Sequence, residues 1–378
     1  MISTSVLNDP EIISIKAGRK TRVKQIRYHH TFHFLFLLMV SVHFSCKGAV
    51  KSELLNSPIE TRPVFYTVDS IEASRMIISD DKDGFFESIS AADIQIQMKR
   101  IQGFSSRNEA IEHYRSYLTT QVSNWTSADQ IAISAVIKSA IEKINLLSSG
   151  IVPDTIKLIK IKTGHYGEDV YYTRGKSILI PENIFADFEA EKQLPVMLHE
   201  IFHIISRYNQ GFRDTMYKMI GFERAGKKIL LPKKLNEVLL TNPDGVSQTH
   251  IISLNDRNSN IKHAIPLITS KYKGFRSDWP AFFDYLNFDL YEVEEDGAGN
   301  LIVKINESGS TTLQLDFSPS FFTKIRDNTQ YIIHPEEIMA DNFMLAVLAN
   351  SKDDFSKFSP KGKILIEQVI GTLKEMAK

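Results

Sequence analysis

The sequence predicts an α+β protein, and three observations lead to this class. Apolar residues recur every three or four positions at 108–122 and 128–147, which predicts two long helices. Residues 156–161 alternate apolar side chains with lysine, which predicts a strand. Helical spacing returns at 194–205, and several short alternating runs follow after residue 247. Helices and strands are therefore expected in separate blocks of one soluble protein.

The first 46 residues predict a secretory signal. A basic stretch at 19–27 precedes an apolar run at 32–40 that is too short for a comfortable membrane span. Cys46 is the only cysteine, so it cannot form an internal disulfide. Its position resembles that of the lipid-modified cysteine of bacterial lipoproteins, although His43 and Phe44 depart from the usual lipobox residues. We expect a lipid anchor on Cys46 in the cell envelope (outer membrane or cell surface), or secretion; the alternative is an incidental cysteine.

Composition and residue spacing predict the nature of the segments between residues 47 and 240. Residues 47–63 contain Ser, Asn and two prolines and predict a tether. We expect a mainly helical region at 64–150, and a sheet with a long helix at 151–240. The sheet would contain the strand at 156–161 and a hairpin of 170–173 with 177–180, and the stretch 211–240 is expected to continue as helix.

A β-rich insert is predicted at 241–330. It opens with the turn sequence N-P-D-G at 242–245, and its strand-like runs are 248–254, 290–294, 300–305 and 311–317. The insert could form one wall of a cleft or serve as scaffold, and the sequence favours neither. Two helices are expected in 331–378, one beginning at Pro335 and one at 362–376.

The most specific motif is H-E-x-x-H at residues 199–203. Residues four apart share one face of a helix, so His199 and His203 can reach the same metal ion. Glu200 would then point at a water on that metal. Zinc hydrolysis requires two imidazoles, a third ligand and a carboxylate base. The alternative is a surface helix in which two unrelated histidines flank a glutamate.

The surroundings of the motif predict a helix. An apolar stripe at helical spacing comprises Leu194, Leu198, Ile201, Phe202 and Ile205. Pro195 is expected in the first turn, where its missing N–H is not needed, and Gly211 is expected to end the helix.

The third ligand is expected on the later helix. Metzincins place a glycine and a histidine shortly after the motif, and residues 204–209 have neither, which excludes that class. A carboxylate remains, and Glu337 has an aspartate, Asp341, four residues later. Glu336 would pair with Ala340 and is the weaker choice. Glu223 and Glu237 are the next candidates.

H-E-x-x-H on one helix with Glu-x-x-x-Asp on a later helix resembles the gluzincin (thermolysin-like) zinc metallopeptidases. The resemblance implies that His199, His203 and Glu337 hold Zn²⁺ and that Asp341 orients a ligand histidine. It also implies a zincin-like core with an edge strand before the metal helix, where extended substrate binds. The gap of about 130 residues between the two segments is longer than the family pattern and implies an inserted subdomain.

The same resemblance implies a metalloendopeptidase that acts on peptide or protein substrates. Glu200 would be the general base, and a His or Tyr would stabilise the oxyanion. Tyr331 and His334 are candidates by proximity to Glu337 in sequence. Four further residues compete with them for this role: His165, Tyr166, His250 and His263.

Two other function classes stay open. One is a catalytically inactive binding or structural lipoprotein with a zincin fold, and the other is a zinc amidase acting on cell-wall peptides. Nucleic-acid binding is not expected, because 45 basic residues balance 45 acidic ones and the basic residues are dispersed outside the N-terminal stretch.

Overall fold

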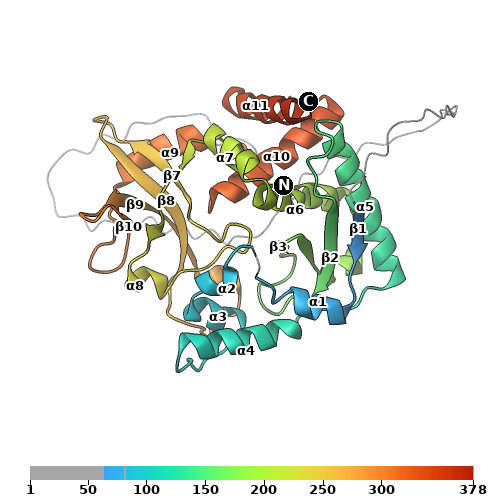
Figure 1. Ribbon diagram of the computed structural model, residues 1–378, viewed down its shortest axis with the longest axis horizontal. Helices are drawn as coiled ribbons and strands as arrows, with labels where there is room; N and C mark the ends of the chain where they lie inside the picture. Colours follow the sequence, from blue (N-terminus) through green and yellow to red (C-terminus); the bar gives the residue numbers. More distant parts are fainter. Residues whose placement is uncertain (1–63, 81, 378) are drawn as a thin grey trace. The chain divides into compact units, whose positions relative to one another are not determined.

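A computed structural model describes residues 64–80 and 82–377 (Figure 1). The predicted signal, the lipid anchor on Cys46 and the tether lie outside the described residues. Within the described part, helices and two sheets occur together, which confirms the α+β class. None of the described helices combines the length and the hydropathy of a membrane span.

The first sheet has four strands in the order β1-β2-β4-β3. Its strands are β1 Val64–Thr67, β2 Thr155–Ile161, β3 Tyr172–Arg174 and β4 Ser177–Pro181. β1, β2 and β4 are parallel, and β3 runs antiparallel to β4 as the edge strand. The predicted strand at 156–161 and the predicted hairpin are confirmed, whereas β1 was not expected.

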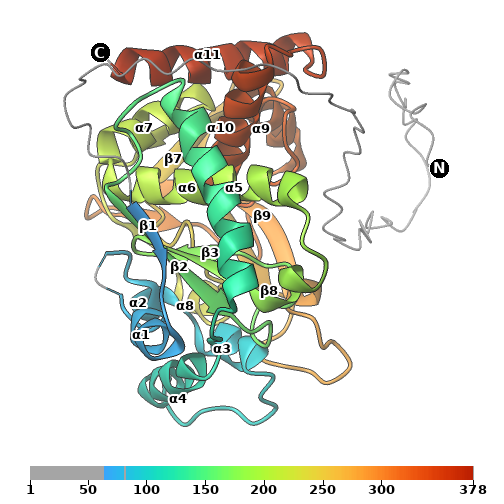
Figure 2. The same cartoon turned by 90° about the vertical axis from the view of Figure 1, so that its right-hand side faces the viewer.

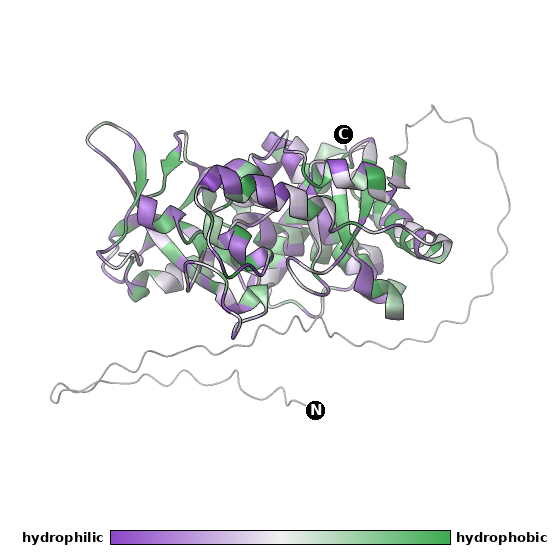
Figure 3. Cartoon of the chain, turned by 90° about the horizontal axis from the view of Figure 1, so that it is seen from below, coloured by the Kyte–Doolittle hydropathy of each residue, from purple (hydrophilic) through white to green (hydrophobic). Residues whose placement is uncertain are grey.

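Helices cover both faces of this sheet, because side chains alternate between the two faces along each strand. Leu158 and Ile178 belong to a core shared with helices α5 (Ser127–Asn145) and α6 (Ala190–Tyr208). Ile159 and Leu179 belong to a second core on the opposite face, shared with the four helices α1 to α4 within residues 70–119. Figure 2 shows α5 and α6 on one side of β2 and β3, and α1 to α4 on the other. The helices carry hydrophilic and hydrophobic residues along their length (Figure 3).

The N-terminal region is mainly helical, as predicted. Its helices are α1 Ser70–Met76, α2 Phe85–Ser88, α3 Ala91–Gln97, α4 Arg107–Thr119 and α5 Ser127–Asn145. A capping box at Thr126 begins α5. The Thr126 hydroxyl accepts a hydrogen bond from the Asp129 N–H, and the Asp129 carboxylate accepts one from the Thr126 N–H. The helices predicted at 108–122 and 128–147 correspond to α4 and α5.

The motif helix is α6, Ala190–Tyr208. Two boundary expectations were wrong. Pro195 lies inside the helix, because α6 starts five residues earlier. Its missing N–H removes the helical bond to the carbonyl of Glu191, which lies in the exposed first turn. Gly211 does not end the helix. Asn209 separates α6 from α7, Gln210–Met219, and its side chain accepts from the Phe212 N–H to cap α7.

The second sheet has six strands in the order β5-β7-β8-β9-β10-β6. The strands are β5 Phe222–Arg224, β6 Ile229–Leu230, β7 His250–Asn255, β8 Ile261–Ser270, β9 Leu286–Glu295 and β10 Leu301–Val303. The prediction that 211–240 continues as helix was wrong beyond α7: β5, β6 and the short α8 Lys233–Asn236 follow, since Gly221 and Gly226 adopt positive φ there.

The expectation of a strand at 311–317 was also wrong. Thr311 makes one isolated bridge to Ile305, and a 3-10 turn at Leu315–Phe317 leads into α9, Ser318–Ile325, because Pro319 favours a helix start. The runs predicted at 248–254, 290–294 and 300–305 correspond to β7, β9 and β10. The longest partner of β9, β8, was not predicted.

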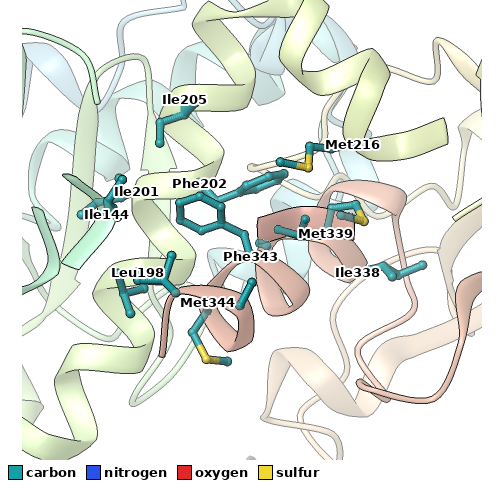
Figure 4. Close-up of a cluster of buried hydrophobic side chains, with 14 of the residues drawn as sticks. Ile144, Leu198, Ile201, Phe202, Ile205, Met216, Ile338, Met339, Phe343 and Met344 are labelled. Carbon is teal, nitrogen blue, oxygen red and sulfur yellow. The ribbon is translucent and has the colours of Figure 1, made fainter. Parts of the chain in front are cut away.

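Helix α10, Pro335–Lys352, begins at Pro335 as predicted, and α11 spans Pro360–Met376. α10 packs along α6 in the main core. Figure 4 shows Phe202 of α6 facing Phe343 of α10, with Met216 and Met339 beside them; the two ring centroids are 5.4 Å apart. This contact fixes how the two helices that carry the predicted ligands lie against each other.

Replacing Phe343, which is fully buried, with Ala should lower the free energy of unfolding by about 3–5 kcal/mol, because the deletion leaves a cavity between α6 and α10. Urea unfolding followed by circular dichroism measures the change. The matched control is Phe322→Ala, at a side chain that is 54% exposed, where a change within about 0.5 kcal/mol is expected. Equal losses in both variants would contradict the assigned core.

Candidate metal centre

The structure brings His199, His203 and Glu337 together, and each offers a ligand atom within 4.8 Å of the others. The Nε2 atoms of His199 and His203 lie 3.1 and 3.6 Å from the same oxygen of Glu337, Oε2. The two histidines come from successive turns of α6, and Glu337 from the first turn of α10, where the helix dipole favours a carboxylate. Three donors from two helices therefore converge on one point.

Each imidazole is oriented by a carboxylate of its own. His199 Nδ1 lies 2.9 Å from Asp341 Oδ1, and His203 Nδ1 lies 3.1 Å from Glu336 Oε1. When a neutral imidazole donates its Nδ1–H to a carboxylate, Nε2 carries the lone pair that can bind a metal. This arrangement turns both Nε2 atoms toward Glu337, and it is the pattern by which outer carboxylates tune metal-binding histidines.

Glu336 orients His203 in the structure, whereas the sequence suggested it only as the weaker candidate for the third ligand. Its carboxylate binds His203 and also accepts hydrogen bonds from Ser206 Oγ at 2.7 Å and from the Tyr217 hydroxyl. Consecutive helical residues point about 100° apart, so Glu336 and Glu337 reach opposite sides of His203. The adjacent glutamates at 336 and 337 were the sequence signal that one of them could orient His203, and the sequence analysis missed it.

Glu200 lies beside the three donors and is 4% exposed. Its Oε2 has no hydrogen-bond partner among the described residues. A ligand atom of Glu200 also lies within 4.8 Å of atoms of His203 and Asp244. Burial, reinforced by the charge of Asp244, raises the pKa of Glu200 to about 8. The carboxyl group therefore holds a proton far more strongly than an exposed glutamate does.

The protonation of the donors follows from their contacts. Burial opposes ionisation of Glu337, but the nearby His203 and His199 outweigh it and lower the pKa of Glu337 to about 2. Burial also opposes a charged His203, but Asp244 and Glu337 raise the pKa of His203 to about 9. Against the same burial, Asp341 and Glu337 raise the pKa of His199 well above its ordinary value. The same contacts therefore favour charged imidazoles beside an ionised Glu337.

Two residues of the turn at 242–245 join the centre, and sequence reasoning assigned them only to a turn. Asn242 Nδ2 donates to Glu337 Oε1 at 2.7 Å. Asp244 Oδ1 accepts from the backbone N–H of Thr173 at 2.7 Å and from the Thr173 hydroxyl. The turn signal N-P-D-G marked their position in the chain but carried no information about these distant partners.

The two predicted oxyanion candidates lie in different places. The ring of Tyr331 stacks on His199, with centroids 6.2 Å apart, and burial raises the pKa of Tyr331 well above its ordinary value, so the hydroxyl keeps its proton. His334 is the N-cap of α10, and its Nδ1 accepts from the Glu336 N–H at 3.1 Å. Burial lowers the pKa of His334 to about 4, which keeps it neutral.

The competing residues have partners elsewhere. His165 Nε2 pairs with the Tyr172 hydroxyl at 2.9 Å, and Tyr166 packs in the same core. His250 bonds Asp214, and His263 bonds Ser253. Of the alternative third ligands, Glu237 pairs with Lys273 and Glu223 lies on β5. Among the described residues, none of these side chains belongs to a cluster that could hold a metal ion.

No protein-family model, no curated protein and no solved structure matches this chain. The donor set itself fits a zinc ion, since two imidazole nitrogens and one carboxylate oxygen are the usual protein ligands of catalytic zinc. Two of the most buried atoms of the cluster, His203 Nε2 and Glu200 Oε2, have no hydrogen-bond partner among the described residues. Unsatisfied polar atoms at such depth are costly, and a cation or a water held between them would satisfy both.

Substitutions should rank the carboxylates by their contacts. Glu337→Ala removes a donor and should abolish stoichiometric zinc binding, as should His199→Ala or His203→Ala. Glu336→Ala and Asp341→Ala remove only the partner of one imidazole, so each should weaken zinc affinity by about 10–100-fold. Competition with a chromophoric chelator measures the affinity, and circular dichroism checks the fold. A stronger loss from Glu336→Ala than from Glu337→Ala would contradict this ranking.

Zinc binding should release protons. Both imidazoles have raised pKa values in the metal-free protein, so they are charged at pH 7 and must become neutral to bind a metal. Affinity should therefore increase as the pH rises from 6 toward 9. Titration calorimetry in two buffers of different ionisation enthalpy measures the number of protons, and identical heats in both buffers would contradict the expectation.

Proposed function

We propose that this protein is a zinc-dependent metallopeptidase of the gluzincin type, which hydrolyses peptide bonds in peptide or protein substrates. One observation carries the proposal: the Nε2 atoms of His199 and His203 both face Glu337 Oε2, while Glu200 lies next to them with a buried, unpartnered oxygen. A purely structural histidine cluster would not need the carboxylate of Glu200 at this point.

Under this proposal His199, His203 and Glu337 hold the zinc. When bound, zinc polarises a carbonyl and lowers the pKa of a water molecule. The chain's own contribution is to hold the Nδ1 atoms of both imidazoles through Asp341 and Glu336, so that their Nε2 atoms face the metal position, and to keep the third donor, Glu337, ionised.

Glu200 is the proposed general base. Its carboxylate accepts a proton from the attacking water and passes it to the leaving amine. A base that must take up and release a proton near neutral pH works best with a pKa close to that pH, and burial raises the pKa of Glu200 in that direction. Proton transfer of this kind contributes about 10²–10⁴-fold to the rate.

Tyr331 is the proposed oxyanion donor. Its ring lies against His199 and its hydroxyl stays protonated, so it can donate to an oxygen that gains charge in the transition state. His334 is the weaker choice, because its Nδ1 already caps α10.

The layout around the centre supports the same proposal. α6 lies on the sheet that ends at the antiparallel edge strand β3, and α6 and β3 are in contact. An edge strand beside the metal helix suits an extended peptide that binds by main-chain hydrogen bonds. This layout resembles the zincin arrangement.

Two alternatives remain as proposals of lower rank. A zinc amidase acting on cell-wall peptides would use the same donors and base. An inactive binding or structural lipoprotein would need neither Glu200 nor its buried oxygen, and the complete set of ligands, base and orienting carboxylates argues against it. An anchor on Cys46, if present, would place any of these activities at the cell envelope.

Glu200→Gln should leave zinc content and the fold unchanged and lower hydrolysis by about 10²–10⁴-fold, because only proton transfer is lost. The assay compares labelled casein with peptidoglycan fragments. The control variant is Glu191→Gln, in the exposed first turn of the same helix, which should keep full activity. Cleavage of peptidoglycan fragments alone would favour the amidase. Zinc binding without hydrolysis of either substrate by wild type would favour the inactive binding protein.

A further inference from the structure

A short segment of the chain, residues 242–247, lies against the metal centre, since Asn242 bonds Glu337 and Asp244 lies within 4.8 Å of His203 and Glu200. His203 and Glu337 are each 1% exposed and Glu200 is 4% exposed. The cavity that reaches Asp244, His334 and Glu336 has a volume of about 20 Å³, which is room for about one water molecule. That cavity is not lined by Glu200, and because Glu200 is so deeply buried, an extended peptide reaches it only after a local rearrangement.

The segment is bound at two points, to Glu337 and to Thr173. Asn242 donates from Nδ2 to Glu337 at 2.7 Å, and its Oδ1 accepts from the Asp244 N–H at 3.1 Å. Asp244 accepts from the N–H and the hydroxyl of Thr173 on β3. One turn thus links a proposed zinc ligand to the edge strand.

The bond from Thr173 is informative because β3 is the edge of its sheet. β3 pairs with β4 on one side only, so the Thr173 N–H points away from the sheet. An extended substrate would offer a main-chain carbonyl oxygen to this N–H. The carboxylate oxygen of Asp244 stands where that carbonyl would accept.

We infer that residues 242–247 form a latch, in which Asp244 occupies the substrate's place on β3 and keeps the metal centre closed until an extended peptide displaces it. This inference rests on the proposed peptidase function. It adds that one contact, between Asp244 and Thr173 of β3, regulates access to the same site.

The energetics allow such a latch to open. Asp244 is a buried carboxylate that lies 3.9 Å from Arg207 Nη2, and Arg207 makes its short ion pair, at 2.6 Å, with Asp83 instead. A buried carboxylate without a short ion pair is costly to keep in place, although His203, within 4.8 Å of Asp244, offsets part of that cost. Its hydrogen bonds to Thr173 are the main attachment, and a peptide carbonyl can replace the bond from the N–H.

The test compares Asp244→Ala with wild type and with Asp256→Ala. Asp256 is the matched control, because its carboxylate also accepts main-chain N–H groups, from Asn258 and Asn260 at 2.8 Å, but in an exposed hairpin loop. Asp244→Asn and Thr173→Val, which remove the charge and the hydroxyl with smaller changes of volume, replace Asp244→Ala if that variant does not fold.

Two measurements do not depend on catalysis. Amide hydrogen exchange at Thr173 should accelerate at least tenfold in Asp244→Ala, and removal of zinc by a chelator should accelerate by a similar factor, while Asp256→Ala matches wild type. Cleavage of short quenched peptides should rise in the same variant. Unchanged exchange at Thr173, or a lower cleavage rate in Asp244→Ala, overturns the latch.

The two proposals fail in different ways. If Thr173 exchange and zinc removal accelerate but neither wild type nor variant cleaves any peptide, the latch stands as a closure of the metal centre and the peptidase function fails. If the protein binds no zinc, amide exchange at Thr173 alone decides whether Asp244 holds the segment in place.

Discussion

The rest of the structure depends on the burial of a cluster of ionisable groups between α6 and α10. Glu200, Glu336 and Glu337 are all at most 4% exposed, as is His203. Isolated buried charges are costly, so Glu336 and Glu337 each meet an imidazole at hydrogen-bonding distance, whereas burial raises the pKa of Glu200 instead. This requirement allows one relative placement of the two helices, and the contact of Phe202 with Phe343 maintains it. In this cluster and its neighbours Asp244 and Asp341, carboxyl groups outnumber imidazoles, which is the balance that a divalent cation would correct.

Features that depend on local pattern could be predicted from the sequence. Helical spacing marked α4, α5 and α6, and the four-residue spacing of Glu337 and Asp341 matched the positions at which both meet His199. Features that depend on distant partners could not be predicted. Asn242 and Glu337 are 95 residues apart in sequence, and nothing near either residue indicates the other. β8 was missed for a related reason: buried on both faces, it lacks the alternation that marks a half-exposed strand.

The edge strand limits how much of a substrate the main chain can recognise. β3 has three residues, and in an antiparallel pair alternate residues turn their N–H and C=O groups outward. Thr173 is the residue whose N–H is shown to point outward, toward Asp244. Recognition along β3 would therefore involve about one substrate residue, and any wider preference would have to come from side-chain contacts beyond this strand. A peptide and a cell-wall stem would differ mainly in those outer contacts.

The proposed latch is attached to the second sheet at its first residues. Just before the latch, the Leu240 N–H donates to the Ile268 carbonyl at 3.0 Å, and the Ser270 N–H donates to Val238 at 2.6 Å, so residues 238–240 extend the second sheet along β8. The next residue, Thr241, donates its N–H to the buried carboxylate of Asp93 on α3. The latch therefore begins at a fixed point where the second sheet meets the N-terminal helices. Opening would have to occur beyond Thr241, through the turn at 242–245, which confines the movement to the residues that contact Glu337 and Thr173.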